Sequence, residues 1–354
     1  MNNRITELRS EMKEQNLDAF LVTTPKNVRY LSSFTGSAGL IVITPEHEYF
    51  ITDFRYTDQA KEQAKGFDVI IHQGKMYEEI SKLLNAEDVK AMGIEADDMN
   101  VSTYSRLSDL FEPMLVQTSG VIETIREVKS EDEIETIREA CDITDQAFEH
   151  ILTFIKPGVT EIEVANELDR FLKGKGASGM SFDTIVASGV RSSMPHGVAS
   201  DKVIEHGDLV TLDFGCYYKG YTSDMTRTIA VGEVDPKLEE IYNIVLEAHN
   251  RVIAGTKAGM TGKEVDALAR DYITEKGYGP NFGHTTGHGI GLDVHEGPAV
   301  ASRNEKPLVE NNIITNEPGI YVSGLGGVRI EDDLIVKADG VESLNRSPKK
   351  LIIV

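Results

Sequence analysis

The feature that most constrains the fold of this chain is an internal repeat in its second part, at an offset of 101 residues. Each copy predicts a helix, a glycine turn, and a second helix that begins with a Thr-x-x-Glu capping box. Two copies predict two similar halves related by a pseudo-twofold axis, and a site between such halves can take side chains from both. The matched pairs are Ala147 with Ala248, Lys156 with Lys257, Gly158 with Gly259, Thr160 with Thr261, Glu163 with Glu264, Val164 with Val265, Lys175 with Lys276 and Gly176 with Gly277.

The chain of 354 residues is too long for one core, and its patterns predict two domains. In the first part, helical patterns alternate with apolar runs at 19–22, 40–43 and 49–51. This alternation predicts a smaller N-terminal α/β domain over residues 1–125. Ser130 and Glu133 then form a capping box before a long amphipathic helix. We therefore expect a second domain over residues 126–354, with an α+β fold in which the repeated helix pairs cover a sheet.

The charge balance limits the partners of the protein. The formal net charge is −22, a field that repels phosphate backbones and anionic lipid surfaces, so we expect neither nucleic acid nor membrane as a partner. Only two cysteines are present, Cys141 and Cys216, which favours a reducing compartment. The first fifteen residues lack the apolar stretch of a secretory signal. We therefore expect a cytoplasmic protein.

Four acidic residues stand at positions where a strand normally buries apolar side chains. Asp213 lies near the end of the apolar run 209–214, and Asp224 opens the segment that returns after it. Glu317 and Glu331 lie in two further apolar segments. A single such acid is most simply a solvated rim residue. Four of them predict a bound cation, because an unpaired buried charge costs several kcal/mol and converging acids repel one another.

Three histidines, His284, His288 and His295, lie in a glycine-rich segment over residues 282–296. The spacing does not match a His-Glu-x-x-His zinc helix, because Thr285 stands where the glutamate should be, and the glycines do not match a phosphate loop. We expect an irregular loop whose small residues let the backbone approach a ligand, with His288 as a metal ligand. His196, in a Pro-His-Gly triplet, has on its own the pattern of an ordinary loop residue.

Four carboxylates and one imidazole form a hard, oxygen-rich ligand set. Such a set favours Mn²⁺, with Co²⁺ and Zn²⁺ as alternatives. Five ligands exceed what one ion needs if positions stay open for a substrate. Two divalent ions bridged by carboxylates, about 3.5–4 Å apart, fit the number of ligands.

Taken together, these motifs resemble the prolidase and aminopeptidase P branch of the pita-bread metallopeptidases. The resemblance covers the second domain, whose expected fold is then the pita-bread fold with its pseudo-twofold repeat. The first domain resembles the N-terminal domain of the same family less distinctively. The motifs that carry the resemblance are Pro-His-Gly at 195–197, Leu-Asp-Phe-Gly at 212–215, Thr-Ser-Asp-Met-Thr-Arg-Thr at 222–228, Gly-His-Gly-Ile-Gly-Leu-Asp-Val-His-Glu at 287–296, Asn-Glu-Pro-Gly-Ile-Tyr at 316–321 and Gly-Val-Arg-Ile-Glu-Asp at 327–332.

Carried over position by position, the resemblance implies residue roles. The five implied metal ligands are Asp213, Asp224, His288, Glu317 and Glu331. The implied substrate-contacting residues are His196 and His295 at the scissile carbonyl and the proline, with His284 and Arg329 lining the same pocket. Arg329 would also orient Glu331 and the neighbouring acids. Glu317 is the candidate to receive a proton from the attacking water and pass it to the leaving nitrogen.

The implied function is metal-dependent hydrolysis of the peptide bond before proline, with a proline-containing peptide as substrate and a homodimer as the expected assembly. The compact chain favours a dipeptidase (a prolidase), and an aminopeptidase P that acts on longer peptides is the alternative. A metal-free enzyme of the creatinase type and a non-catalytic pita-bread binding protein are both expected to lack some of these ligands. A methionine aminopeptidase normally lacks the N-terminal domain.

Overall fold

The computed structural model describes residues 2–354, with side chains from residue 3 onward. The chain divides into two compact units, Met1–Arg126 and Glu127–Val354. Among the described residues, every helix is too short or too polar to cross a lipid bilayer.

The first unit is built on one six-stranded sheet in the order β4-β3-β2-β1-β5-β6. Strand β1 pairs antiparallel with β2 and parallel with β5, so the sheet is mixed. The predicted α/β domain and its strands at 19–22 and 40–43 are confirmed. The strands are β1 (Ala19–Val22), β2 (Leu40–Ile43), β3 (Glu48–Thr52), β4 (Asp68–Ile71), β5 (Ala91–Glu95) and β6 (Met114–Thr118). The helices are α1 (Asn2–Glu14), α2 (Pro25–Ser32), η1 (Phe54–Tyr56), α3 (Thr57–Gln63), α4 (Met76–Ala86), α5 (Val101–Leu110) and α6 (Val121–Glu127).

The repeat predicted in the second unit is present in the structure. Its four long helices are α7 (Glu131–Leu152), α8 (Glu161–Gly174), α9 (Pro236–Gly255) and α10 (Gly262–Glu275). Helices α8 and α10 begin and end at positions 101 residues apart, and each begins with a complete capping box, at Thr160 with Glu163 and at Thr261 with Glu264. The segment before each helix also forms an antiparallel bridge, from Thr160 to Val203 and from Thr261 to Pro307. The equivalent positions therefore have equivalent structures in the two halves.

The strands of the second unit form several small antiparallel sheets. The sheet orders are β12-β9-β8, β14-β13-β15-β18-β19, β11-β10-β7 and β16-β17. The strands are β7 (Gly179–Met180), β8 (Ile185–Ser188), β9 (Leu209–Phe214), β10 (Cys216–Tyr218), β11 (Tyr221–Thr222), β12 (Met225–Ala230), β13 (Gly287–Gly289), β14 (Glu296–Val300), β15 (Ile313–Asn316), β16 (Gly319–Val322), β17 (Gly326–Arg329), β18 (Asp332–Lys337) and β19 (Gly340–Ser343). Short 3-10 turns are η2 (Gly189–Ser193) and η3 (Gly279–Asn281).

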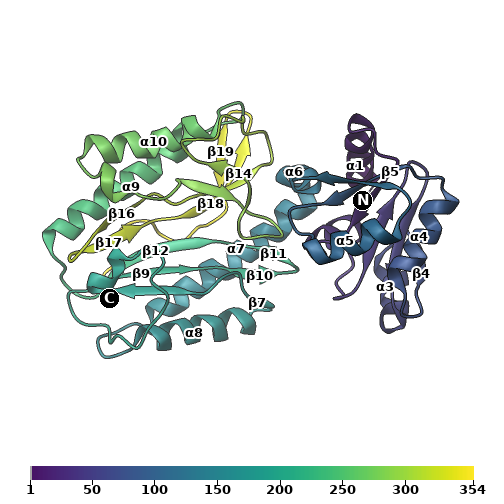
Figure 1. Cartoon of the computed structure of the whole chain (residues 1–354). Helices are drawn as coiled ribbons and strands as arrows, with labels where there is room; N and C mark the ends of the chain where they lie inside the picture. The colour runs from purple at the N-terminus through teal and green to yellow at the C-terminus, as the bar shows by residue number, and fades with distance from the viewer. Residues whose placement is uncertain (1) are drawn as a thin grey trace. The chain divides into compact units, whose positions relative to one another are not determined.

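Each helix pair of the second unit has its own apolar core. Helices α7 and α8 bury Phe148, Val164 and Leu168 in one cluster with residues of β8, β9 and β12. Helices α9 and α10 bury Val245 and Val265 in another cluster with residues of β15 to β18. Figure 1 shows the two helix pairs beside different groups of strands, with α9 and α10 in green and α7 and α8 in teal. The α+β prediction for this domain is confirmed.

Candidate metal centre

One cavity of about 460 Å³ in the second unit is lined by all nine residues that the sequence singled out as site residues. These are Asp213, Asp224, His288, Glu317, Glu331, His196, His284, His295 and Arg329. The remaining lining residues are Phe182, Asp183, Ile185, Pro195, Val198 and Thr285. The nine site residues, which are up to 135 residues apart in the chain (His196 to Glu331), therefore face one space.

The first half of the unit supplies two acids from one antiparallel pair of strands. Asp213 lies on β9, directly opposite Thr226 of β12, and Asp224 immediately precedes β12. The backbone N–H of Asp224 donates to the buried carboxylate of Asp333 at 2.9 Å. Asp213 and Asp224 are 8% and 4% exposed, so the strand ladder holds both carboxylates away from bulk water.

The second half supplies two more acids at strand ends. Glu317 follows β15, and its backbone N–H donates to the carbonyl of Thr286 at 2.8 Å. Glu331 lies between β17 and β18, where its N–H donates to the carbonyl of Thr226 and its side chain accepts from the Thr226 hydroxyl at 2.6 Å. This last pair of contacts joins a strand of the first half to an acid of the second half. Asn316, next to Glu317, does not line the cavity, and its amide donates to the carbonyl of His249 at 3.1 Å.

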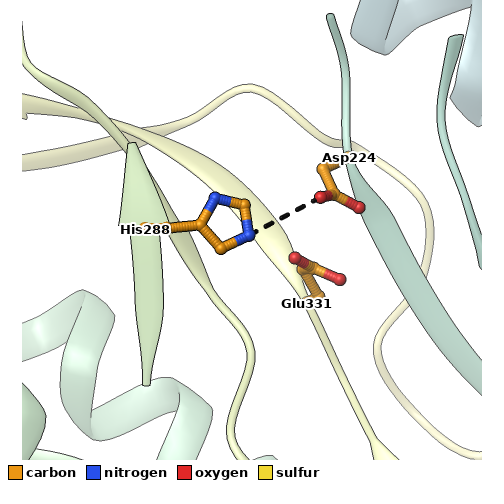
Figure 2. A group of neighbouring side chains, drawn as sticks. All are labelled: Asp224, His288 and Glu331. Atoms are coloured by element: carbon orange, nitrogen blue, oxygen red, sulfur yellow. Dashed lines mark ion pairs between the residues drawn. The ribbon is translucent and has the colours of Figure 1, made fainter. Parts of the chain in front are cut away.

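His288 on β13 presents one ring nitrogen to the acids. Its Nδ1 lies 3.1 Å from the carbonyl oxygen of Gly289, which can only accept, so Nδ1 carries the hydrogen and Nε2 has a free lone pair. That Nε2 lies 3.3 Å from Glu317 Oε1 and 3.9 Å from Asp224 Oδ2. Figure 2 shows His288, Asp224 and Glu331 converging, with one ligand atom from each within 4.8 Å of the others. Burial lowers the pKa of His288 to about 4, with a contribution from His295, which favours the neutral, metal-binding form.

The carboxylates are short of positive partners. Asp213 Oδ1 and Asp224 Oδ1 are buried without a hydrogen-bond partner among the described residues. Burial, together with the charges of the neighbouring acids, raises the pKa of Asp224 and Glu331 well above their usual range, and burial raises that of Glu317 to about 8. Unpartnered oxygens and mutual repulsion at one point are the conditions that a divalent cation relieves. The donor set therefore fits bound metal.

Arg329 is the buried cation next to this cluster, and it contacts one acid directly. One guanidinium nitrogen donates to Asp213 Oδ2, and its Nε donates to the Thr226 hydroxyl at 3.1 Å. The expectation from the sequence was that Arg329 orients Glu331 and the neighbouring acids, and Asp213 is one of these. In the structure it reaches Glu331 only through the Thr226 hydroxyl, which itself donates to that carboxylate. Arg329 therefore holds Asp213 by a direct contact and Glu331 only indirectly.

Tyr321 is a site residue to which sequence reasoning assigned no role. Its hydroxyl accepts from Arg329 Nη1 at 2.7 Å and lies 2.9 Å from His284 Nε2. His284 Nδ1 lies 2.8 Å from the Thr285 carbonyl, so that nitrogen carries the hydrogen and Nε2 accepts from the Tyr321 hydroxyl. Burial and the Arg329 charge lower the pKa of His284 to about 4. The Thr285 carbonyl thus fixes the tautomer of His284, and the Tyr321 hydroxyl links the His284 ring to Arg329.

The other two histidines lie on loops around the same cavity. The rings of His288 and His295 have centroids 4.3 Å apart and are tilted by 58°. His196 is exposed and lies in the loop that follows η2. The structure therefore brings His196, His284 and His295 to one cavity wall together with the acids.

The expected irregular loop over residues 282–296 is present at 282–286 and 290–295, but it is interrupted at His288. Residues 287–289 form strand β13, which pairs with β14 and β15. A Cβ on Gly287 would lie 2.0 Å from the carbonyl oxygen of Thr315, and one on Gly289 would lie 2.0 Å from that of Gly297. The small residues therefore let neighbouring protein strands approach closely, and the backbone of these glycines does not serve as a ligand cradle.

Two further buried polar residues support the cluster without lining the cavity. Asp333 accepts from the backbone N–H of Asp224 and from the Cys141 thiol at 3.3 Å, and burial raises its pKa to about 8. Arg227 donates to the main-chain carbonyl of Glu331 at 2.6 Å and to the carboxylate of Asp332 at 2.8 Å. In the sequence, Asp332 and Asp333 could have been found as two adjacent acids inside an apolar strand.

Comparison with known proteins places this geometry in a family. Residues 135–338 match metallopeptidase family M24, and residues 4–128 match the Creatinase/Prolidase N-terminal domain. The chain is 40% identical to an Xaa-Pro dipeptidase of Pyrococcus furiosus, over 99% of this chain and all of that protein. It is similar to the solved structure of an Xaa-Pro dipeptidase from Bacillus anthracis, with 53% identity, a TM-score of 0.98 and 99% coverage of both chains.

A second solved structure, an X-Pro aminopeptidase from Thermotoga maritima, matches with 42% identity and a TM-score of 0.92, over 96% of this chain and 98% of that one. Matches of this identity over nearly whole chains confirm the two-domain architecture with a pita-bread second domain. The chain therefore belongs to metallopeptidase family M24, in the group that carries a Creatinase/Prolidase N-terminal domain.

Proposed function

We propose that this protein is an Xaa-Pro dipeptidase that hydrolyses the bond before proline with the help of two divalent metal ions. The observation that carries the proposal is the buried cluster of four carboxylates and one neutral imidazole, with Asp213 Oδ1 and Asp224 Oδ1 unpartnered, on the wall of a cavity large enough for a dipeptide. A binding protein on this fold has no use for such a cluster, because each buried acid costs folding free energy.

The five residues that would hold the metal are Asp213, Asp224, His288, Glu317 and Glu331. Four oxygen ligands with one imidazole favour Mn²⁺, and Co²⁺ and Zn²⁺ are the alternatives. Bound metal in such a site supplies Lewis acidity toward the scissile carbonyl and lowers the pKa of water to near neutrality. Asp213 is held for this task by Arg329, and Glu331 by the Thr226 hydroxyl.

The proton transfers fall to Glu317. Its carboxylate lies at the cavity wall, with Oε1 3.3 Å from His288 Nε2, so it faces the space that the attacking water and the substrate would share. We propose that Glu317 takes a proton from the attacking water and delivers it to the nitrogen of the leaving proline. His196 and His295 border the same space and would donate to the carbonyl oxygen or hold the proline.

The names of similar proteins support the dipeptidase. The Pyrococcus furiosus and Bacillus anthracis proteins are both called Xaa-Pro dipeptidases, and this chain covers nearly all of each. The Thermotoga maritima protein, called an X-Pro aminopeptidase, keeps aminopeptidase P activity on longer peptides as the second candidate. The full ligand set argues against a metal-free enzyme of the creatinase type.

We also propose a cytoplasmic homodimer that binds neither nucleic acid nor membranes, with functional domains over residues 1–125 and 126–354. The net charge of −22 supports the exclusion of anionic partners, and two buried free cysteines are consistent with a reducing compartment.

The proposal is tested with purified protein, Mn²⁺, and the peptides Ala-Pro and Ala-Pro-Ala, each with and without a chelator. Release of alanine from Ala-Pro that stops with chelator supports a metal-dependent dipeptidase. Release from Ala-Pro-Ala at a similar rate would assign the protein to aminopeptidase P instead. If neither peptide is cut with Mn²⁺, Co²⁺ or Zn²⁺, the peptidase proposal is wrong.

A further inference from the structure

Glu161, the first residue of α8, is a fully buried carboxylate that lies outside the cavity lining. Its two oxygens accept five hydrogen bonds. Oε1 accepts from the backbone N–H and the hydroxyl of Ser188, at 2.7 and 2.9 Å. Oε2 accepts from Arg191 at 3.1 Å, and from the backbone N–H and the hydroxyl of Ser200 at 3.1 and 2.6 Å. So many donors fully compensate the burial of one charge.

The partners of Glu161 stand at the two ends of the loop that carries His196. Ser188 is the last residue of β8, where the chain leaves the sheet, and Ser200 lies four residues beyond His196. The main chain of α8 holds the same returning segment, because the N–H groups of residues 161 and 162 donate to the carbonyls of Lys202 and Ser200 at 3.0 and 2.9 Å. One helix end thus fixes both the exit and the return of this loop.

Arg191 connects the Glu161 carboxylate to a residue of the cavity wall. Its second guanidinium nitrogen donates to the carbonyl of Val198 at 2.9 Å, and Val198 lines the cavity beside His196. Gly197 lies against the sheet, because a Cβ there would be 2.8 Å from the Cβ of Ala187. Gly197, which follows His196, therefore packs on β8. Arg191, which precedes His196, links the loop to the Glu161 carboxylate.

The internal repeat shows that the fold of the helix does not require this acid. The capping box of Thr160 and Glu163 recurs at Thr261 and Glu264, but the position equivalent to Glu161 is Gly262. A Cβ on Gly262 would lie 2.2 Å from the carbonyl oxygen of Ala299, so the second half excludes a side chain at the same place. The buried carboxylate belongs only to the half that carries His196.

We propose that Glu161 is a positioning residue for His196, which holds the imidazole at the cavity wall by fastening both ends of its loop. The role assigned to His196 rests on the proposed function. A residue that only stabilises the fold would lower activity to the same extent whether or not His196 is present. A residue that acts through His196 loses its effect when that imidazole is removed.

The test is a double-mutant cycle between Glu161→Gln and His196→Ala, assayed with Ala-Pro. Glutamine keeps the shape of the side chain, but its NH₂ group faces donors and the charge opposite Arg191 is lost. We expect Glu161→Gln alone to lower kcat/KM by about 10- to 100-fold, the usual effect of a misplacement near 1 Å, with bound metal unchanged. In the His196→Ala background the same change should cost less than about threefold.

Glu264→Gln is the matched control, because it changes a carboxylate in the other half at the equivalent helix start, and it should leave kcat/KM within about twofold. Equal losses from Glu161→Gln in both backgrounds, or no loss at all, would overturn the proposal. If Glu161→Gln does not fold, Ser200→Ala removes one of the five bonds and should give a smaller loss with the same dependence on His196.

A measurement independent of catalysis separates this inference from the proposed function. In protein with ¹⁵N-labelled histidine, the imidazole signal of His196, assigned by its absence in His196→Ala, should shift in Glu161→Gln and stay in place in Glu264→Gln. An unmoved signal in Glu161→Gln refutes the positioning role even if the enzyme is active. If the wild-type protein cleaves no Xaa-Pro peptide, the proposed function fails while the shift still decides the placement of His196.

Discussion

Raising the pH of the metal-free protein from 5 to 8 is expected to remove the stability that a protonated Glu317 gives to its second unit. The cause lies in the acids of the cavity, because burial raises the pKa of Glu317 from its ordinary 4.5 to about 8. Between these values the folded state binds a proton that the unfolded state releases. The stability contributed by this group is therefore fully present below pH 4.5 and is lost as the pH rises through 8.

The size of the effect follows from this shift. Moving one pKa from 4.5 to about 8 makes the folded state about 3.5 kcal/mol less stable at pH 8 than at pH 5. For a unit of the length of Glu127–Val354, this corresponds to a fall of roughly 7–14 °C in the unfolding temperature. The raised pKa values of Asp224, Glu331 and Asp333 act in the same direction. Burial lowers the pKa of His249, His284 and His288 to about 4, so these groups act in the opposite direction and stabilise the folded state as the pH rises to 6.5.

The assay is thermal unfolding by calorimetry at pH 5 and pH 8, with chelator throughout, on the wild-type protein and on Glu317→Gln. The variant removes this titration and the charge repulsion by which Glu317 raises the pKa of Asp224 and Glu331, and it keeps the pH dependence of the histidines. The difference between the two slopes therefore reports Glu317 together with its effect on these two acids. In a separate sample at pH 8 without chelator, added Mn²⁺ should raise the unfolding temperature of the wild type, because it binds the folded state. A wild-type slope equal to that of the variant would refute the reasoning.

Three further predictions concern residues in and behind the cluster. Asp224→Asn should lower bound metal per chain, measured by elemental analysis, and reduce activity by more than about 100-fold. Mutating residues that only support metal ligands already lowers affinity or activity by about 10- to 100-fold. Unchanged metal content would contradict the ligand assignment. Tyr321→Phe should lower kcat/KM by about 10-fold, because Arg329 loses its hydroxyl partner. The unfolding temperature should change by no more than a few degrees. Full activity would show that Tyr321 does not position Arg329. Arg227→Met should reduce the free energy of unfolding in urea by about 3–5 kcal/mol, because it breaks a fully buried ion pair with Asp332; wild-type stability would refute this.

Local patterns predicted the parts of the structure that depend on residues close in sequence. The capping boxes at Thr160 and Thr261 determine helix starts through side chains three residues apart, and both helices begin where expected. Acids inside apolar runs marked the cavity because burial without compensation is costly, whichever strands lie next to them. Asp213 and Glu331 could therefore be grouped before their strand pairing was known.

Contacts between distant segments could not be predicted in this way. Tyr321 appears in the sequence as one more apolar strand residue, and only the fold brings its hydroxyl between Arg329 and His284. Glu161 appears as an ordinary acid in the first turn of a helix, where negative charge is favourable in any case. Its burial depends on Ser188 and Ser200, which are 27 and 39 residues away.

The cluster is also an interface between the two halves of the repeat. Asp213 and Asp224 come from β9 and the start of β12 in the first half, whereas His288, Glu317 and Glu331 come from the second half. In the metal-free protein, packing the halves together brings mutually repelling acids into contact, and Arg329 offsets only part of that repulsion. Bound cations reverse the sign of this interaction, so metal binding and the packing of the two halves must favour each other. In this pseudo-twofold fold, the repelling acids lie at the interface between the two halves of the repeat, where cations from solution can bind and remove the repulsion.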